Sequence, residues 1–565
     1  MFYKIIRKII FNIFIFHLFF NLYGQSENQI NFDKKHRLLW VYISQNHNYP
    51  LKKIKYSSRV KNRLNKIGWK QNRTDYKIPL EFANQMSEYV ETIRHCSRML
   101  RAISVKASHS QYCKLLDLKF VEKIEPVKIY KRKQDSTILS RKDYLARASK
   151  YGHSYTQLEQ IGIPALHEYG LTGKGVRIAL LDAGFDKHHE VFQEIIAENR
   201  LIAERDFIFN DHTVINENRE DSIYYQDSHG TSVWSLIGAY QPYTMLGGAY
   251  NAEFLLGKTE RIKSETRIEE DNFIAGIEWA DNLGADIIST SLGYRDFGDF
   301  EYQFEDLDGH TARTTKAVNW ASERGILCIT SAGNERTRFR RGGLITPGDS
   351  PNVITVGAVD STGMIAYFSS HGPTADGRIK PDLCAMGVNN FVASSYSPSS
   401  YSIGSGTSYS TPLITAGCAL LLEQFPGWSP AIVLDELKNY ASRSGNPDMR
   451  YGWGIPDFFS TVWVNKKIPE ITRGSAKNTI VCAPNPVASS ATFYYRNPDS
   501  VLTSNSSLNI YNLYGQKIYS REIDKLVPVW NLRDYSGERV AAGIYVVKVE
   551  SRELQSKIGK ISVIF

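Results

Sequence analysis

The middle of the chain alternates short apolar runs with helical segments, and this alternation limits the fold more than any other feature. It begins near Gly170, and the runs are rich in Val, Ile and Leu, as buried strands are. We expect strands at 176–181, 252–256, 287–289, 326–330 and 353–356, and helices at 272–283, 314–324 and 411–424. Such alternation predicts an α/β fold, with a mainly parallel sheet covered by helices on both faces. In sheets of this kind, functional side chains gather at the carboxyl ends of the strands.

The segments on either side have different patterns. Residues 35–130 suggest a small α+β unit, with expected strands at 38–44, 102–105 and 120–127 and a helix at 80–94. A polar stretch from Lys131 to Lys150 follows and is predicted to be a linker. After residue 466 the helical pattern stops, and residues 478–565 carry short Tyr-, Val- and Ile-rich runs separated by turn residues. This last pattern is typical of a β-sandwich.

The first 24 residues have the layout of a secretory signal peptide. Lys4, Arg7 and Lys8 precede an apolar run over residues 9–23, and Gly24 stands at its end. The run is shorter than the ~20 residues that a membrane-spanning helix needs, although a signal anchor stays the alternative. We therefore expect this segment to take the chain across the inner membrane.

Export would permit disulfide bonds, so the cysteines matter. There are six of them in 565 residues, which is too sparse for a disulfide framework, and none has zinc-ligand spacing. Cys96 could pair with Cys113, and the sequence leaves this open.

The formal net charge of +9 hides a strong asymmetry along the chain. Residues 25–150 hold 28 basic and 11 acidic residues, whereas residues 151–477 hold 27 and 41. The basic character therefore belongs to the front of the chain, and no nucleic-acid partner is predicted. The front segment is either a solvated basic domain or a segment whose charge complements the acidic part behind it.

Three polar motifs stand where the predicted elements end or begin. Asp182 follows the strand over 176–181, His229 opens an apolar helix, and Ser408 lies in the glycine-rich segment 404–412. Each motif alone is weak, because it could be a cap, a turn or a loop. Together they have the order Asp, His, Ser, which is one of the known chain orders of a catalytic triad.

A fourth block, Ser331-Ala332-Gly333-Asn334, follows the strand over 326–330. With the other three blocks in this order, residues 160–460 or so resemble the subtilisin-like serine peptidases. The resemblance implies a three-layer α/β sandwich and a triad of Asp182, His229 and Ser408. It also implies that Asn334 and the Ser408 backbone N–H stabilise the oxyanion. We expect Pro412 in the first turn of the helix that carries Ser408, where it would cost no hydrogen bond.

The resemblance extends to substrate binding. Ser291, Leu292 and Gly293 resemble the edge strand that pairs with an extended peptide, and Ser331, Ala332 and Gly333 would line the primary specificity pocket. Ile345 and Thr346 either close that pocket, favouring a modest apolar side chain, or only pack the core.

No cofactor and no metal is predicted. The acidic stretch over residues 306–309 could bind calcium, but an ordinary acidic turn is the simpler interpretation. Many family members have His-Pro-Asp after the catalytic strand, whereas this chain has His189-Glu190-Val191, so a family calcium ligand is missing. Structural calcium is left open.

The resemblance also gives the two ends a meaning. Residues 25–150 resemble a propeptide that assists folding, blocks the cleft and is removed by self-cleavage between about 130 and 155. Residues 478–565 resemble the sorting domain of the type IX secretion system. The supporting blocks are Ala483–Pro486, Leu508–Lys517, Gly543–Tyr545 and Lys557–Phe565. A generic β-sandwich adhesion module is the alternative.

The sequence as a whole predicts a serine endopeptidase that is secreted and then extracellular or attached to the outer surface. Its partners would be a protein or peptide substrate, its own propeptide as inhibitor, and the type IX machinery. The alternatives are a dedicated maturation peptidase or transpeptidase, and an inactive surface adhesin on the same fold. The expected divisions are 1–24 (signal peptide), 25–150 (propeptide and linker), 151–465 (peptidase), 466–477 (linker) and 478–565 (sorting domain).

Overall fold

The computed structural model describes most of the chain after residue 36. The described ranges are 37–44, 51–127, 150–217, 219–262, 266–297, 300–465, 480–483, 491–495, 506–512, 514–522, 529–541, 543–551 and 557–563. The predicted signal peptide and both predicted linkers lie outside these ranges, apart from Lys150. No helix in the described part is both long enough and apolar enough to cross a membrane.

The described chain divides into two compact units. The first comprises Met1–Lys55, Lys70–Lys131 and Glu265–Asp271, and the second comprises Tyr56–Trp69, Arg132–Ser264 and Asn272–Phe565. The front segment of the sequence therefore contributes to both units, and so does the middle of the chain.

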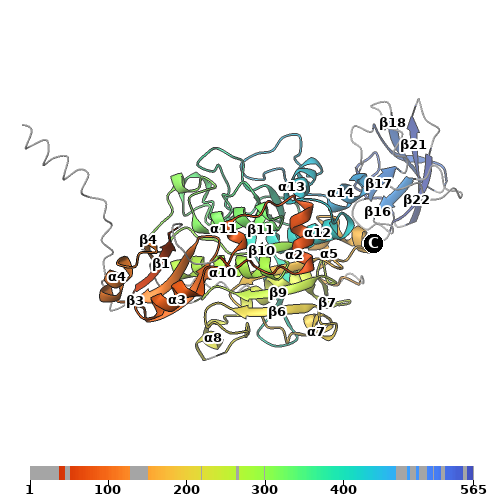
Figure 1. Ribbon diagram of the computed structural model, residues 1–565. Helices are drawn as coiled ribbons and strands as arrows, with labels where there is room; N and C mark the ends of the chain where they lie inside the picture. The colour runs from red at the N-terminus through yellow and green to blue at the C-terminus, as the bar shows by residue number, and fades with distance from the viewer. Residues whose placement is uncertain are drawn as a thin grey trace, which may run out of the picture. The chain divides into compact units, whose positions relative to one another are not determined.

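The first unit is built on a four-stranded antiparallel sheet (Figure 1). In spatial order its strands are β2 (Thr92–Ser97), β3 (Ala102–Ala107), β1 (Arg37–Ile43) and β4 (Val121–Val127), and its helices are α3 (Leu80–Ser87) and α4 (His109–Leu116). Side chains along β1 alternate between two apolar clusters: Leu39 and Val41 pack with the helices, and Leu38 and Trp40 pack on the opposite face.

The helix predicted over residues 80–94 is too long. It ends at Ser87, and strand β2 begins at Thr92. Thr92 and Ile93 are β-branched, and they pair with Lys106 and Val105 of β3. The cross-strand partners decide the conformation here, and they are remote in sequence.

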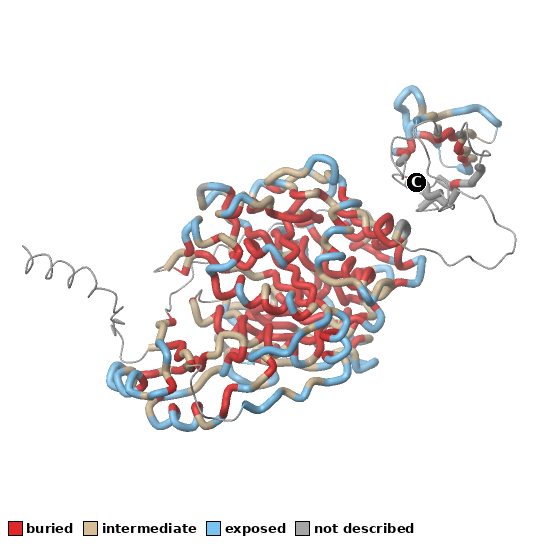
Figure 2. The backbone as a smooth tube through the Cα atoms, turned by 45° about the horizontal axis from the view of Figure 1, so that its top comes forward, coloured by how far each residue is buried: buried red, intermediate tan, exposed pale blue. Residues whose placement is uncertain are grey.

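The second unit contains a seven-stranded sheet in which every pairing is parallel. Its spatial order is β13 (Leu383–Met386), β12 (Val353–Val359), β11 (Leu327–Ser331), β10 (Ile287–Thr290), β5 (Arg177–Asp182), β9 (Glu253–Lys258) and β6 (Leu201–Asp206). All strands except β6 are wholly or almost wholly buried, and Figure 2 shows this buried interior in red. This confirms the predicted α/β class.

Helices cover both faces of this sheet. Helices α12 (Thr407–Gln424) and α9 (Ser228–Gly238) contact each other, and α12 also contacts β10–β13. Helix α11 (Arg313–Glu323) contacts β11 and β12, and α10 (Arg267–Asn282) precedes β10. The remaining helices of the peptidase region are α5 (Tyr155–Glu159), α6 (Ile163–Glu168), α7 (Gln193–Ala197), α8 (Arg219–Tyr224), α13 (Pro430–Asn439) and α14 (Phe458–Asn465).

In the described residues of the C-terminal region, all regular elements are strands. A sheet of β16 (Ile480–Ala483), β17 (Ala491–Tyr495) and β20 (Val529–Trp530) accompanies a sheet of β19 (Lys517–Glu522), β18 (Ser506–Tyr511), β21 (Gly543–Ser551) and β22 (Lys557–Val563). Both sheets contribute to one apolar cluster, in which the Trp530 ring lies edge-on to that of Tyr545 at 5.7 Å. Two sheets that share one core form the predicted sandwich.

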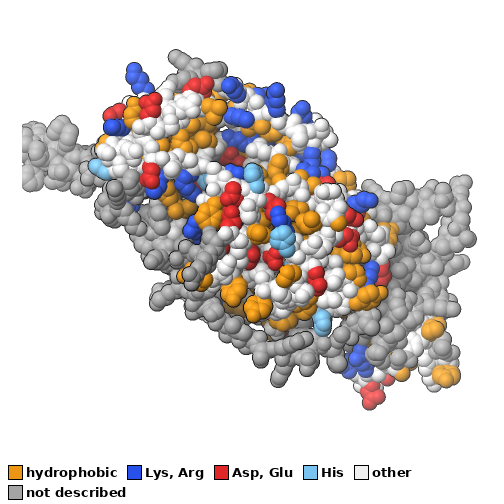
Figure 3. All heavy atoms as spheres, turned by 90° about the horizontal axis from the view of Figure 1, so that it is seen from below, with side chains coloured by type: hydrophobic (Ala, Val, Ile, Leu, Met, Phe, Trp, Pro, Cys, Tyr) orange, Lys and Arg blue, Asp and Glu red, His pale blue; other side chains and the backbone are white. Residues whose placement is uncertain are grey.

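On the face drawn in Figure 3, acidic and basic side chains lie among each other. No disulfide joins Cys96 to Cys113 in the described part of the chain, and Cys328, Cys384 and Cys418 are buried.

His167 of α6 is a buried titratable group away from the predicted triad. Only 6% of its surface is exposed; its Nε2 donates to the Gly248 carbonyl at 2.9 Å, and its Nδ1 lies 3.1 Å from the Tyr151 hydroxyl. Burial lowers the pKa of His167 from 6.5 to about 4, against a smaller opposing effect of the Gly248 hydrogen bond. The folded protein therefore holds this imidazole neutral.

Acid should destabilise the protein through His167. The unfolded chain takes up this proton first, so the stabilisation is complete above pH 6.5 and is lost as the pH falls toward 4, by about 3 kcal/mol. We expect the Tm of a Ser408→Ala protein to drop over this range by several degrees more than that of the same protein carrying His167→Gln. Replacing the exposed His188 by Gln should leave the drop unchanged, and equal drops in all three proteins would contradict the assignment.

Candidate active site

The residues predicted for catalysis lie along one edge of the seven-stranded sheet. Strands β11, β10 and β5 are neighbours and parallel, so their carboxyl ends lie at the same edge. Asp182 is the last residue of β5, Ser291 follows β10, and Asn334 follows β11. His229 and Ser408 are the second residues of α9 and α12.

Asp182 and His229 form a hydrogen-bonded pair. The Nδ1 of His229 lies 2.8 Å from Oδ1 of Asp182, and the same oxygen accepts the Ala183 backbone N–H at 2.7 Å. Asp182 is fully buried, whereas the side chain of His229 is 30% exposed. The carboxylate thus holds the proton on Nδ1, which makes Nε2 the basic nitrogen of the ring.

Gly230 allows helix α9 to approach the end of β5 this closely. A Cβ atom at this position would lie 2.1 Å from the Gly184 carbonyl oxygen and 3.1 Å from the Cβ of Asp182. Any side chain would push the helix, and His229 with it, away from the carboxylate.

Ser408 is tied to Ser291 through two hydrogen bonds. Its hydroxyl donates to the Ser291 carbonyl at 3.2 Å, and its own carbonyl accepts the Ser291 hydroxyl at 2.8 Å. The second hydrogen bond is explained by a proline in α12.

Pro412 is the sixth residue of α12, so the expectation that it stands in the first turn and costs no hydrogen bond is wrong. Because Pro412 has no N–H for the carbonyl four residues earlier, the Ser291 hydroxyl takes that place.

Asn334 is held at the start of α12 by Thr407. Its Oδ1 accepts the Thr407 backbone N–H at 2.9 Å and the Thr407 hydroxyl at 3.0 Å, and that hydroxyl accepts the Gly333 N–H at 3.3 Å. The oxygen end of the amide is therefore fixed, and its NH₂ end is directed away from Thr407. A side-chain donor is thus oriented beside the N-terminus of α12, where the helix dipole favours negative charge.

Tyr409 lines the same region. Its ring lies 6.3 Å from that of His229, measured between centroids. Burial, and to a lesser extent the charge of Asp182, raise the pKa of Tyr409 to about 12. Its hydroxyl therefore stays protonated at neutral pH and does not act as a base there.

The segments predicted to bind substrate flank Ile345. A Cβ atom on Gly293 would lie 2.1 Å from Cδ1 of Ile345, and one on Gly333 would lie 2.9 Å from the same atom. The two glycines therefore leave room for this half-buried side chain between their segments. Thr346 is fully buried, and its hydroxyl donates to the Tyr294 carbonyl at 2.9 Å, so it packs the core.

Two groups of acidic residues deserve comparison with a cation site. One carboxylate oxygen from each of Asp206, Asp211 and Glu217 lies within 4.8 Å of the other two, which is close enough for the three to hold one metal ion. The Lys258 ammonium, however, lies 3.0 Å from Asp206 and 3.6 Å from Glu217, so a side-chain cation already offsets part of the negative charge of this cluster. In the stretch 306–309, Asp308 accepts backbone N–H groups of His310 and Thr311, as a turn cap does.

The sequence did not predict that Thr407 orients the Asn334 amide, and it assigned Ser291 to substrate binding alone. Thr407 stood in a recognised motif, but its contact with Asn334 joins residues 73 positions apart. A hydroxyl residue directly before the serine at a helix start was the one signal that could have pointed to it.

Comparisons with known proteins agree with this geometry. Residues 173–454 match the model of the subtilase family, and residues 482–563 match that of the secretion system C-terminal sorting domain. Subtilisin E of Bacillus subtilis strain 168 is 30% identical over 332 residues, which are 57% of this chain and 75% of that protein. Subtilisin Savinase of Lederbergia lenta is 29% identical over 299 residues, 53% of this chain and 94% of that protein.

The chain belongs to the subtilase family of serine proteases. It acts on protein substrates, and its type IX sorting domain indicates secretion to the outer surface or the extracellular space.

Proposed function

We propose that the protein is a secreted serine endopeptidase that hydrolyses peptide bonds through Asp182, His229 and Ser408. The observation that carries the proposal is the 2.8 Å contact between Nδ1 of His229 and the buried Asp182, at the sheet edge where Ser291 forms hydrogen bonds with Ser408. A serine hydroxyl is a poor nucleophile at neutral pH and needs such an oriented base.

In the proposed reaction His229 moves the proton at each step. Nε2 takes the Ser408 hydroxyl proton as Oγ attacks the scissile carbonyl carbon, and it returns that proton to the leaving amine as the C–N bond breaks. Water then attacks the acyl carbon while His229 takes one of its protons; the bond between that carbon and Ser408 Oγ breaks, His229 returns the proton to Oγ, and the carboxylic acid product leaves. Asp182 keeps the imidazole oriented and stabilises the imidazolium. The Ser408 hydroxyl first has to turn from the Ser291 carbonyl toward Nε2.

The negative charge that develops on the carbonyl oxygen would be stabilised by Asn334 and the Ser408 backbone N–H. The support is the Thr407 contact, which fixes the Asn334 amide before any substrate binds. A donor already in place costs no reorganisation during the reaction.

We place the substrate along Ser291, Leu292 and Gly293 on one side and Ser331, Ala332 and Gly333 on the other. Extended peptides pair with such an edge through their backbone. Ile345 would close the pocket between these segments, because only the two glycines make room for it. Its size favours modest apolar side chains in the substrate.

We propose further that residues 1–24 are a signal peptide and that the front segment, to about residue 150, is an inhibitory propeptide. Within the first unit, the Asp271 carboxylate accepts hydrogen bonds from the Trp40 indole, from the Ser104 hydroxyl at 3.0 Å and from Arg94 at 3.2 Å. Asp271 is fully buried and lies near the start of α10. The front sheet thus uses an acidic side chain of the peptidase sequence as part of its own core, as a complementary propeptide would.

The experiment that tests this function is labelling with a fluorophosphonate probe. The secreted protein should be modified at Ser408, and no modification would favour the alternative of an inactive adhesin. Profiling cleavage of a peptide library separates a broad endopeptidase from a dedicated maturation peptidase or transpeptidase, since the latter would cut or join only one sequence class.

Removal of residues 478–565 should stop secretion without stopping catalysis. The tail has its own apolar core, so the peptidase region loses none of its own packing when the tail is absent. We expect the shortened protein to accumulate in the periplasm and still to react with the probe, as measured by cell fractionation. Unchanged secretion would contradict the role of the tail, and the Tyr535→Ala change at an exposed tail residue is the control.

A further inference from the structure

A short part of the front segment, residues 56–69, belongs to the same unit as the catalytic candidates. It contains helix α2 (Ser58–Lys66), which the sequence analysis did not predict. The residues before Tyr56 and after Trp69 belong to the first unit. The chain therefore enters the second unit at Tyr56 and leaves it at Trp69. We call residues 56–69 the anchor segment.

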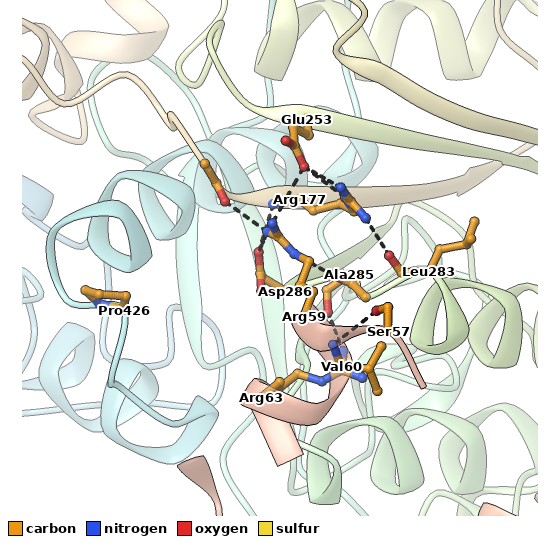
Figure 4. A network of polar contacts seen from close by, with 12 residues as sticks. Ser57, Arg59, Val60, Arg63, Arg177, Glu253, Leu283, Ala285, Asp286 and Pro426 are labelled. Carbon is orange, nitrogen blue, oxygen red and sulfur yellow. Dashed lines mark hydrogen bonds and ion pairs between the residues drawn. The ribbon is translucent and has the colours of Figure 1, made fainter. Parts of the chain in front are cut away.

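Arg59 of the anchor segment binds a group of oxygen atoms (Figure 4). Its Nε donates to the Gly284 carbonyl at 2.9 Å, and its Nη2 donates to the Gly175 carbonyl at 2.9 Å and to the Asp286 carboxylate. Its Nη1 also lies 3.7 Å from Glu253. All these acceptors face one guanidinium, which is the group best shaped to meet several oxygens at once.

Arg63, one turn further along α2, is buried. It donates to the Asp281 carboxylate and to the Ala285 carbonyl. Arg324 holds the other oxygen of Asp281 at 3.0 Å, and both Asp281 and Arg324 are fully buried. One carboxylate thus joins a guanidinium of the anchor segment to a guanidinium of the peptidase region, out of contact with water.

The two ends of the anchor segment cover Arg324. The rings of Tyr56 and Trp69 lie 5.3 and 4.9 Å from its guanidinium, within cation–π distance. Gly325 makes the close packing of α2 feasible, because a Cβ atom there would lie 3.0 Å from Ile67. The fit therefore includes shape as well as charge.

These partners lie at the edge of the sheet opposite the catalytic candidates. Gly175 lies two residues before the strand that ends in Asp182, Asp286 directly precedes β10, and Glu253 is the first residue of β9. All are at the amino ends of parallel strands, whereas Ser291 and Asn334 follow the carboxyl ends. Binding of the anchor segment is thus independent of the substrate cleft.

We propose that this surface is a docking site for an arginine-bearing helix, and that the anchor segment uses it to keep the front segment bound after the linker has been cut. The proposal rests on the proposed function only in treating residues 25–150 as a removable propeptide. Cutting between residues 131 and 150 breaks no contact of Arg59 or Arg63. Dissociation must then separate a buried ion pair, which is slow.

The test uses full-length Ser408→Ala protein with a recognition site for an added sequence-specific protease between residues 132 and 149. After cutting, gel filtration measures how fast the front fragment separates. We compare the parent with the double variant Arg59→Gln and Arg63→Gln, and with Lys61→Gln as the matched control, since Lys61 is an exposed base on the same helix. We expect the double variant to release the fragment more than ~10-fold faster, and the control to behave as the parent does.

Asp286→Asn provides a second arm from the peptidase side and should also speed release, which covers the case in which the double variant misfolds. Hydrogen exchange of the uncut proteins should show loss of protection in residues 56–69 of the double variant, and not in the parent or in the Lys61→Gln control. Equal release rates in the parent and in a folded variant would overturn the proposal. Because the added protease makes the cut, this outcome does not depend on whether Ser408 is the nucleophile, which the probe experiment decides separately.

Discussion

Replacement of Ser408 by alanine is expected to lower kcat for a peptide substrate by about 10⁶-fold, the magnitude known from subtilisin. The variant keeps the Asp182–His229 pair but has no hydroxyl for the base to activate. What activity remains would come from substrate binding and oxyanion stabilisation alone. The measurement is kcat on a fluorogenic peptide taken from the library profile.

The same variant should keep its front segment covalently attached, because self-cleavage between about 130 and 155 needs Ser408. Ser405→Ala is the matched control: this exposed serine lies three residues earlier in the same glycine-rich segment, where it accepts the Asn389 N–H. Normal processing of the Ser408→Ala chain would show that another protease removes the front segment, and retained activity would show that Ser408 is not the nucleophile.

The second large effect is expected at Asn334. Asn334→Ala should lower kcat by ~10²–10³-fold and leave KM almost unchanged, because the amide would act on the oxyanion and not on the bound substrate. Thr407→Val should give a smaller loss in the same parameter, since the valine keeps the shape and the backbone N–H contact but loses the hydroxyl that fixes the amide.

The control for this series is Asn352→Ala, an exposed asparagine whose amide contacts Asn319. A rise in KM with constant kcat would assign Asn334 to substrate binding. If Thr407→Val had no effect, the hydroxyl contact would not contribute to placing the amide.

The sequence predicts the five inner strands of the sheet and the position of the candidate residues at element ends, because both follow from local patterns; the two outer strands, β6 and β13, were not predicted. Apolar runs ending in Asp182 or followed by Asn334 identify strand ends, and a parallel sheet brings neighbouring strand ends together. The position of His229 near the start of a helix was visible for the same reason. What joins these elements was not visible, since the Gly230 approach and the Thr407 contact depend on backbone positions far away in the chain.

The anchor segment shows more clearly that contacts between remote parts of the chain cannot be predicted from local sequence patterns. Arg59 and Arg63 lie in a basic region that the sequence pattern interprets as solvated charge, yet the carboxylates that bind them, Asp286 and Asp281, lie more than 200 residues further on. Charge counted along the chain says which part is basic, but it does not say which guanidinium is buried. In the same way, the strand over Thr92–Ser97 depends on its partner β3, and helix propensity over residues 80–94 gave the wrong boundary.

Pro412 restricts which substitutions can be accepted near Ser408 during evolution. It stands four residues after Ser408 and leaves that residue's carbonyl to the Ser291 hydroxyl. Loss of the Ser291 hydroxyl alone would leave the Ser408 carbonyl without a hydrogen bond. A residue with a backbone N–H at position 412 would supply that hydrogen bond from within the helix. We therefore expect changes at positions 291 and 412 to be coupled, although one residue follows a strand and the other lies inside a helix.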